Sequence, residues 1–239
     1  MKTETRNCQN CHVDFQIEPQ DFAFYEKIKV PPPTFCPQCR FQRRLMFRNE
    51  RVLYKRTCGL CGKGMISTVT PESPYVVYCN PCWWAGDWEA STYGREYDLN
   101  RNFFEQLKDL QKTVPFPALT LDYLTNINSE YTNYAGHLKN CYLVFDADNG
   151  ENVVYSKGLV DLKDSMDVLN VGESELCYED VRGGGNSRLF YSQDCDNCID
   201  TFFSLDCTGC NNCFGCVNLK NKKYHIFNQP YPKEEYEKK

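Results

Sequence analysis

Eight of the sixteen cysteines lie in the first 82 residues, as four C-x2-C pairs. The pairs are Cys8/Cys11, Cys36/Cys39, Cys58/Cys61 and Cys79/Cys82. Two thiolates at this spacing can present both sulfurs to one tetrahedral ion, at about 2.3 Å each. All-thiolate sites select zinc or iron, and structural four-cysteine zinc sites commonly have this spacing. We therefore predict two Zn²⁺ ions, each held by four of these cysteines.

The order of the pairs favours two consecutive zinc ribbons. Sequential pairing joins the first pair to the second and the third to the fourth, while a cross-brace would join the first to the third. The segment 40–57 resembles a connector between two units, which favours sequential pairing. Pro37, Gly59, Gly62 and Pro81 suit the tight turns. A ribbon of about thirty residues buries too little apolar surface to fold alone, so folding and metal binding should be coupled.

A second group of cysteines lies near the end of the chain at three-residue spacing: Cys195, Cys198, Cys207, Cys210, Cys213 and Cys216. Three interpretations are open. The thiols pack as small buried groups, or Cys195, Cys198, Cys207 and Cys210 hold a third metal ion, or the run from Cys207 holds an iron–sulfur cluster. The run departs from the ferredoxin pattern in its last spacing and lacks a Cys-Pro step. Cys141 and Cys177 are isolated, and we expect them to be packed inside. A Cys/His site at Cys213 and His225 is a further alternative.

The later cysteines belong to a repeat of twelve residues. Apolar residues recur at this step in one column: Tyr142, Val154, Met166, Tyr178, Phe190, Phe202, Phe214 and Ile226. A second column of small or apolar residues has the same period: Ala147, Leu159, Val171, Gly183, Cys195, Cys207 and Leu219. A fixed short period with turn-forming residues between the columns predicts a β-solenoid over 129–232. One coil has twelve or twenty-four residues, and the large side chains of the first column favour twenty-four.

The remaining segments complete a mainly β chain with minor α structure. Residues 100–113 place Phe103, Phe104, Leu107 and Leu110 on one helical face, and prolines follow. We expect this helix to pack on its neighbours within a linker over 91–128. The predicted domains are a first zinc ribbon with basic connector (1–56), a second ribbon (57–90), this linker, the solenoid (129–232) and a charged tail (233–239).

The connector between the ribbons is strongly basic. Only Glu50 opposes its seven cations, which are Arg40, Arg43, Arg44, Arg48, Arg51, Lys55 and Arg56. In a continuous helix four of these arginines would share one side. Arginines near aromatic side chains suit phosphate contacts and base stacking, and Trp83, Trp84 and Trp88 follow the second ribbon. The other interpretations are pairing with the acidic solenoid and contact with a protein partner.

Charge and composition narrow the function. Up to Lys63 the chain has twelve Lys/Arg and six Asp/Glu, whereas from Ser129 onward it has eleven and eighteen. It contains no apolar run long enough to span a membrane and no apolar signal segment, so we expect a cytoplasmic protein. Three scattered histidines and two four-thiolate sites with every position filled offer little for catalysis, and no small-molecule substrate is evident. The sequence predicts a non-catalytic zinc-binding protein that contacts nucleic acid or a ribonucleoprotein through its basic head. The alternative is a protein-interaction scaffold that uses the solenoid face, with the arginines paired internally.

The N-terminal segment resembles a known family in its C-x2-C pair, DFQIEPQDFAFYEKI and PPPTFCPQCRFQRR. This pattern is similar to the probable zinc-ribbon domain family, and the resemblance implies that Cys8, Cys11, Cys36 and Cys39 are the metal ligands. The whole chain, including GCVNLKNKKYHIFN, is similar to uncharacterised cysteine-rich zinc-ribbon proteins of candidate-phyla bacteria. That group brings no established activity. Its members have more cysteines in the solenoid columns, where this chain has Val153, Ser165 and Leu189, which argues against metal throughout the solenoid.

Overall fold

The computed structural model describes residues 2–46 and 49–239. The chain forms two compact units, Met1–Asn49 and Glu50–Lys239, which we describe separately. The described residues are mainly β structure with five short α-helices, as the sequence predicts. The finer division into five domains remains a prediction.

The first unit is a β-hairpin followed by two helices. Its elements are β1 (Glu4–Asn7), β2 (Asp14–Ile17), α1 (Pro19–Lys27) and α2 (Pro37–Leu45). Strands β1 and β2 are antiparallel. The small core consists of Phe15 and Ile17 packed against cysteines, with Phe22 and Tyr25 of α1 partly buried beside them. So small an apolar core supports the expectation that a metal is needed for folding.

The second unit begins with a similar hairpin and a lobe of short elements. These are β3 (Tyr54–Thr57), β4 (Gly64–Ser67), β5 (Val77–Tyr78), α3 (Asn80–Trp84), the 3₁₀ helix η1 (Ala90–Tyr93), α4 (Phe103–Gln111) and β6 (Phe116–Pro117). Strands β3 and β4 are antiparallel, and β5 pairs with β6 in parallel. Val77, Ala118 and Leu119 form the buried core of this lobe.

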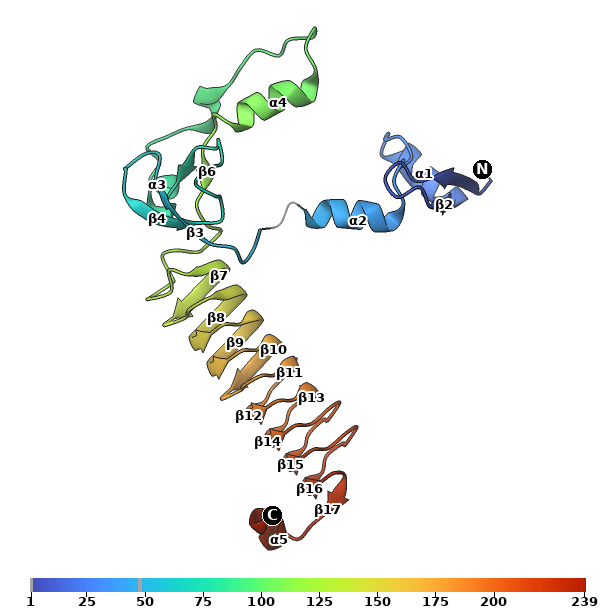
Figure 1. Ribbon diagram of the computed structural model, residues 1–239, viewed down its shortest axis with the longest axis vertical. Helices are drawn as coiled ribbons and strands as arrows, with labels where there is room; N and C mark the ends of the chain where they lie inside the picture. The colour runs from blue at the N-terminus through green and yellow to red at the C-terminus, as the bar shows by residue number, and fades with distance from the viewer. Residues whose placement is uncertain (1, 47–48) are drawn as a thin grey trace. The chain divides into compact units, whose positions relative to one another are not determined.

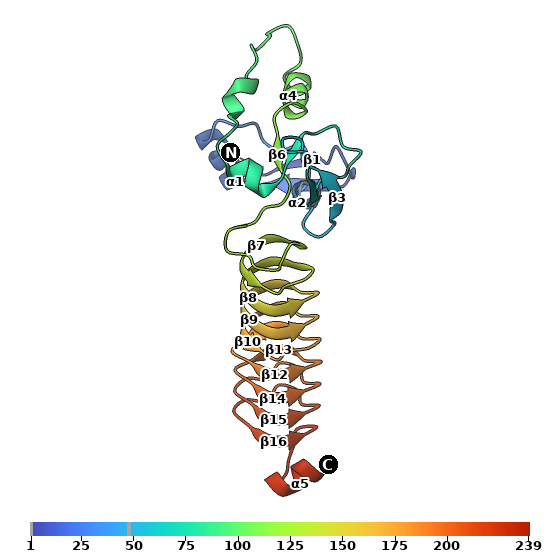
Figure 2. The same cartoon turned by 90° about the vertical axis from the view of Figure 1, so that its left-hand side faces the viewer.

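The rest of the second unit is a β-solenoid of about eight turns over residues 132–226 (Figures 1 and 2). Its strands are β7 (Thr132–Lys139), β8 (Val144–Val154), β9 (Lys157–Met166), β10 (Leu169–Glu175), β11 (Val181–Gly184), β12 (Ser187–Phe190), β13 (Gln193–Asp196), β14 (Ile199–Phe202), β15 (Asn211–Phe214) and β16 (Lys223–Ile226). The short antiparallel strand β17 (Gln229–Pro230) and the helix α5 (Lys233–Lys238) follow the last coil.

One coil contains twelve residues, so the preference for twenty-four is wrong. Val144 pairs with Thr132 and Phe145 with Lys157, and later parallel pairs keep the same offset of twelve. The preference rested on large side chains that would not fit inside so small a coil. Those side chains face outward: Tyr142 is 42% exposed and Phe214 is 40% exposed. The Ala147 column does point inward, with Leu159 and Val171 almost fully buried.

Within each coil the backbone follows a three-residue pattern. From Ala135 to Cys216 every third residue is buried, apart from the half-exposed Gly183. From Tyr134 to Phe227 every third residue has a positive φ, which places four left-handed corners in each twelve-residue coil. Asn, Asp and Gly tolerate this conformation best and occupy many of the corners. Each side of the coil is therefore one inward residue, one outward residue and one corner.

Inward polar side chains connect the coils. Ser156 donates to the carbonyl of Val154 (2.8 Å) and accepts from the N–H of Val168 one coil later (3.2 Å). Cys198 makes the same two contacts, with the Asp196 carbonyl and the Cys210 N–H. These side chains satisfy backbone groups that would otherwise be buried without a partner.

The predicted helix over 100–113 is present as α4, but its packing differs from the expectation. Asn102 caps it, accepting hydrogen bonds from the N–H groups of Phe104 and Glu105. Phe103 is 53% exposed and Phe104 is 74% exposed, and α4 contains no buried residue. Its apolar face is therefore largely exposed within the described part of the chain. Among the described helices, none has the length and apolar character needed to cross a membrane.

Candidate metal centres

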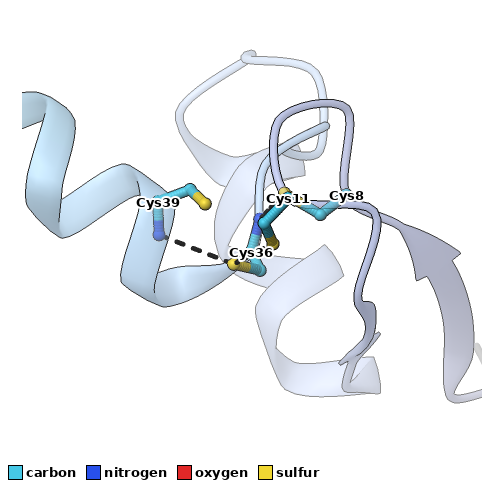
Figure 3. Close-up of side chains that lie close together, drawn as sticks. All are labelled: Cys8, Cys11, Cys36 and Cys39. Carbon is cyan, nitrogen blue, oxygen red and sulfur yellow. Dashed lines mark hydrogen bonds between the residues drawn. The ribbon is translucent and has the colours of Figure 1, made fainter.

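The first four cysteines converge on one point. The Sγ atoms of Cys8, Cys11, Cys36 and Cys39 all lie within 4.8 Å of one another (Figure 3). The Sγ atoms of Cys11 and Cys36 are 3.7 Å apart. A tetrahedral zinc site with Zn–S bonds of about 2.3 Å requires S–S separations of about 3.8 Å. The four sulfurs therefore fit a tetrahedral metal ion.

The first pair lies in the turn between β1 and β2. The N–H of Cys8 donates to the carbonyl of Val13 (3.1 Å), and the N–H of His12 donates to that of Cys8 (3.0 Å). His12 takes a left-handed conformation with φ 59°. This tight turn brings the side chain of Cys11 back toward Cys8.

The second pair lies at the start of α2. Cys36 is the N-cap residue, Pro37 follows it and Cys39 is in the first helical turn. The N–H of Cys39 donates to the Sγ atom of Cys36 (3.5 Å), as Figure 3 shows, and the N–H of Cys36 donates to that of Cys8 (3.2 Å). The positive end of the helix dipole also favours thiolate here.

The second centre repeats this construction with different residues. Cys58, Cys61, Cys79 and Cys82 bring their Sγ atoms within 4.8 Å of one another, and those of Cys61 and Cys79 are 3.9 Å apart. Gly62 takes the left-handed position (φ 72°) that His12 takes in the first turn. Cys79 is the N-cap residue of α3. Sequential pairing of the four C-x2-C motifs is thus the arrangement in the structure, and the cross-brace is not.

Backbone donors stabilise one thiolate in each centre. Burial alone would raise the pKa of the Cys8 thiol. Hydrogen bonds from the N–H groups of Cys11, Cys36 and Asn10 outweigh this effect and bring the pKa down to about 6. Burial and the N–H groups of Cys61, Cys79 and Leu60 act on Cys58 in the same way, and its pKa is also about 6. A thiol with so low a pKa is mostly anionic at neutral pH, the form that binds metal.

The cysteines of the solenoid are arranged differently. Cys195 and Cys198 stack on Cys207 and Cys210, as a twelve-residue coil requires. Yet among the described residues only the two centres of the head bring three or more metal-binding side chains mutually within 4.8 Å. Burial raises the pKa of Cys177 and of Cys213 to about 12, so both are neutral thiols, whereas the contact with Cys195 lowers the pKa of Cys207 to about 6. The inward cysteines instead donate to backbone carbonyls, as Ser156 does.

Comparison of the chain with protein-family models finds no match. Comparison with curated proteins finds none either. The resemblance to zinc-ribbon proteins therefore remains a prediction.

The basic connector does not form one continuous helix. Helix α2 ends at Leu45, β3 begins at Tyr54, and the two compact units meet between Asn49 and Glu50. Arg40, Arg43 and Arg44 belong to the first unit, and Arg51, Lys55 and Arg56 to the second, while Arg48 lies outside the described residues. A shared side for four arginines would require a continuous helix, and the described residues do not form one.

The cations in the second unit have separate structural surroundings. Arg56 donates to the carbonyl of Thr70 (2.7 Å) and to that of Tyr75. The guanidinium of Arg51 lies 5.6 Å from the ring centre of Phe145, and Lys55 is exposed. Within the described residues of this unit, none of the three forms an ion pair with a solenoid carboxylate. The ion pair between the connector and the solenoid has the opposite polarity: the solenoid residue Lys157 donates to the carboxylate of Glu50 (2.5 Å).

Sequence reasoning missed two supporting residues. Asn10 donates from its side chain to the Sγ atom of Cys39 (3.3 Å), which helps to orient that ligand. Asn80 donates to the carbonyl of Leu119 (3.0 Å) and ties α3 to the lobe core. Both are asparagines directly beside a ligand cysteine, and that position is the only signal the sequence offers.

Proposed function

We propose that this is a non-catalytic zinc-binding protein that contacts nucleic acid through basic side chains beside its first metal centre. The observation that supports this most is the composition of α2. The helix has the sequence PQCRFQRRL, with three arginines and no acidic residue. It begins at two of the four ligands, so metal binding would fix the helix that presents the arginines.

The surroundings of these arginines suit nucleic acid. Arg43 and Arg44 are exposed, and their guanidinium carbons lie 5.8 Å from the ring centre of Phe35 and 5.9 Å from that of Phe41. Phe41 is itself 56% exposed. An exposed ring beside cationic groups can stack on a base while the arginines contact phosphates.

The geometry also supports zinc and a structural role for it. Four thiolates at tetrahedral spacing match zinc, and they fill all four positions. A catalytic zinc site would keep one position open for water or substrate. We expect metal analysis of the purified chain to give two zinc ions per protein. One ion or fewer in fully folded protein would contradict this assignment.

A salt-dependent binding titration tests the nucleic-acid contact. Three phosphate contacts from Arg40, Arg43 and Arg44 predict a log–log salt slope of about −2 for single-stranded RNA. Affinity should therefore fall about twentyfold between 50 and 200 mM salt. Duplex DNA should be titrated in parallel.

Two double variants distinguish binding through α2 from a general effect of positive charge. Arg43→Gln with Arg44→Gln should weaken RNA binding strongly and reduce the salt slope. Lys163→Gln with Lys220→Gln removes the same charge from the solenoid surface and should change little. No binding at low salt, or equal losses in the two double variants, would refute the proposal.

A protein-interaction scaffold is the second candidate, because aromatic rings stack along one exposed corner of the solenoid. The rings of Tyr191 and Phe203 are parallel with centres 4.9 Å apart, and Phe214 lies 5.3 Å beyond Phe203. Tyr191 is 49% exposed and Phe203 is 53% exposed. If RNA does not bind at low salt, a Phe203→Asn variant that no longer binds a protein partner of the wild type would support this candidate.

A further inference from the structure

A cavity of about 400 Å³ lies within the second unit, between the second metal centre and the first coils of the solenoid. Its floor is the segment 117–122 and its walls come from α3 and from two solenoid corners. A concavity of this size is large enough for a side chain together with part of its backbone.

The floor is held from both sides. On the side of the metal centre, Ala118 donates to the carbonyl of Tyr78 (2.9 Å), and Asn80 donates to that of Leu119 (3.0 Å). On the solenoid side, the N–H of Asp122 donates to the carbonyl of Ala135 (3.0 Å). The cavity is therefore a preformed part of the unit.

Its walls are largely aromatic. Trp83 and Trp84 directly follow the ligand Cys82 in α3, and Tyr134 comes from a solenoid corner. Trp83 is held by Trp88, whose indole N–H donates to the Trp83 carbonyl (3.0 Å) and whose ring lies 4.6 Å away. Trp84 is 64% exposed. Tyr134 has φ 51°, like the other corners of the solenoid.

The charge of the cavity is negative. Two carboxylates line it, those of Asp122 and Asp146, and none of its described lining residues carries a positive charge. Neither carboxylate forms an ion pair or side-chain hydrogen bond with another described residue. Both are thus available to a ligand.

We propose that this cavity binds a lysine or arginine side chain from a basic segment of a partner protein. The aromatic faces attract a cation through their quadrupoles, and the carboxylates neutralise it. The same carboxylates would repel phosphate, so in this proposal Trp83 and Trp84 serve a basic segment and not a nucleic acid. The inference is independent of the proposed function, because α2 is not part of the cavity.

Calorimetric titration of the zinc-loaded full chain with two synthetic peptides tests the proposal. The probes are acetyl-(Lys-Gly)4-amide and its uncharged counterpart acetyl-(Gln-Gly)4-amide, with spermidine as a free cation. We expect saturable binding of the lysine peptide, a shift of the Trp84 indole N–H signal in NMR spectra, and no binding of the glutamine peptide. Trp84→Ala should weaken binding about fivefold, the value of one solvent-exposed cation–π contact.

Matched variants distinguish the cavity from the generally acidic surface. Asp122→Asn with Asp146→Asn should weaken the lysine peptide tenfold or more. Asp167→Asn with Glu179→Gln removes two carboxylates from other solenoid corners and should change affinity less than twofold. Equal losses in the two double variants, or equal binding of the glutamine peptide, would overturn the proposal. Spermidine that binds as tightly as the peptide, or RNA that shifts the Trp84 signal, would overturn the assignment to a protein partner.

Discussion

Asp180 provides a test of how the solenoid interior is built. Its carboxyl group is fully buried in an inward column, and neither oxygen has a hydrogen-bond partner. Burial raises its pKa to about 7. In the unfolded chain the pKa of an aspartate is about 3.9, so folding raises the pKa of this carboxyl group by about three units.

The sign and size of the effect on stability follow from linkage. Between about pH 4 and pH 7 the folded state retains the proton and the unfolded state does not, so the free energy of unfolding falls as pH rises. At about 1.4 kcal/mol per pH unit, the cost above pH 7 reaches about 4 kcal/mol. Below about pH 4 the cost is absent. The group therefore destabilises the solenoid at neutral pH.

A serine at position 180 should remove this cost. Ser156, Ser192 and Ser204 occupy the same column as Asp180, and each donates to the carbonyl two residues earlier. Asp180→Ser should donate to the Tyr178 carbonyl and accept from the N–H of Ser192. Asp180→Asn removes the charge with little change in size and serves as the isosteric control.

Urea unfolding of the full chain, followed by circular dichroism at pH 5 and pH 8, measures the effect. Comparison of variants at each pH cancels the titration of the cysteine ligands, which all chains share. Both variants should be more stable than the wild type by several kcal/mol at pH 8 and by much less at pH 5. An advantage that is the same at the two pH values would refute the reasoning, because burial of the charge would then not be the cause.

Three further outcomes are expected. Removal of metal by a strong chelator should abolish hydrogen-exchange protection in residues 4–17, since structural zinc contributes about 10–16 kcal/mol to such units. The solenoid should stay protected. A protected hairpin in verified metal-free protein would contradict this expectation. Ser204→Ala should lower the unfolding free energy by about 1–3 kcal/mol, because it leaves the N–H of Cys216 without a partner. Ser204→Cys should lower it by less. Equal losses of unfolding free energy in the two variants would argue against the inter-coil hydrogen bond. Arg56→Gln should destabilise the lobe by about 1–3 kcal/mol in thermal unfolding through loss of its bonds to two carbonyls, while exposed Lys55→Gln should be neutral.

The two four-cysteine clusters could be predicted from the sequence almost completely. Ligand type, spacing and sequential order are local properties, because a C-x2-C pair folds within its own turn. What the sequence did not reveal is that the second pair of each centre begins a helix. That feature depends on how the N-cap cysteine and the following proline are placed against the hairpin.

The basic connector and the helix over 100–113 show the limits of local patterns. Periodicity identified the helix correctly, but not that Phe103 and Phe104 would remain exposed. The spacing of the arginines suggested one face, yet the chain passes from one compact unit to the next between them. Whether a side chain is buried depends on neighbours that are distant in sequence.

The repeat was determined by the sequence, and its geometry was not. A period of twelve is visible in the columns that begin at Tyr142 and Ala147, but it fits coils of twelve or twenty-four residues. Only the tertiary structure shows that one column faces out, the other in, and that a left-handed corner follows at every third residue. The reason is that the direction of a side chain depends on the backbone bend at each corner. Some corners are the expected Asn and Asp, but others are Tyr191 and Phe203, residues that rarely take a positive φ.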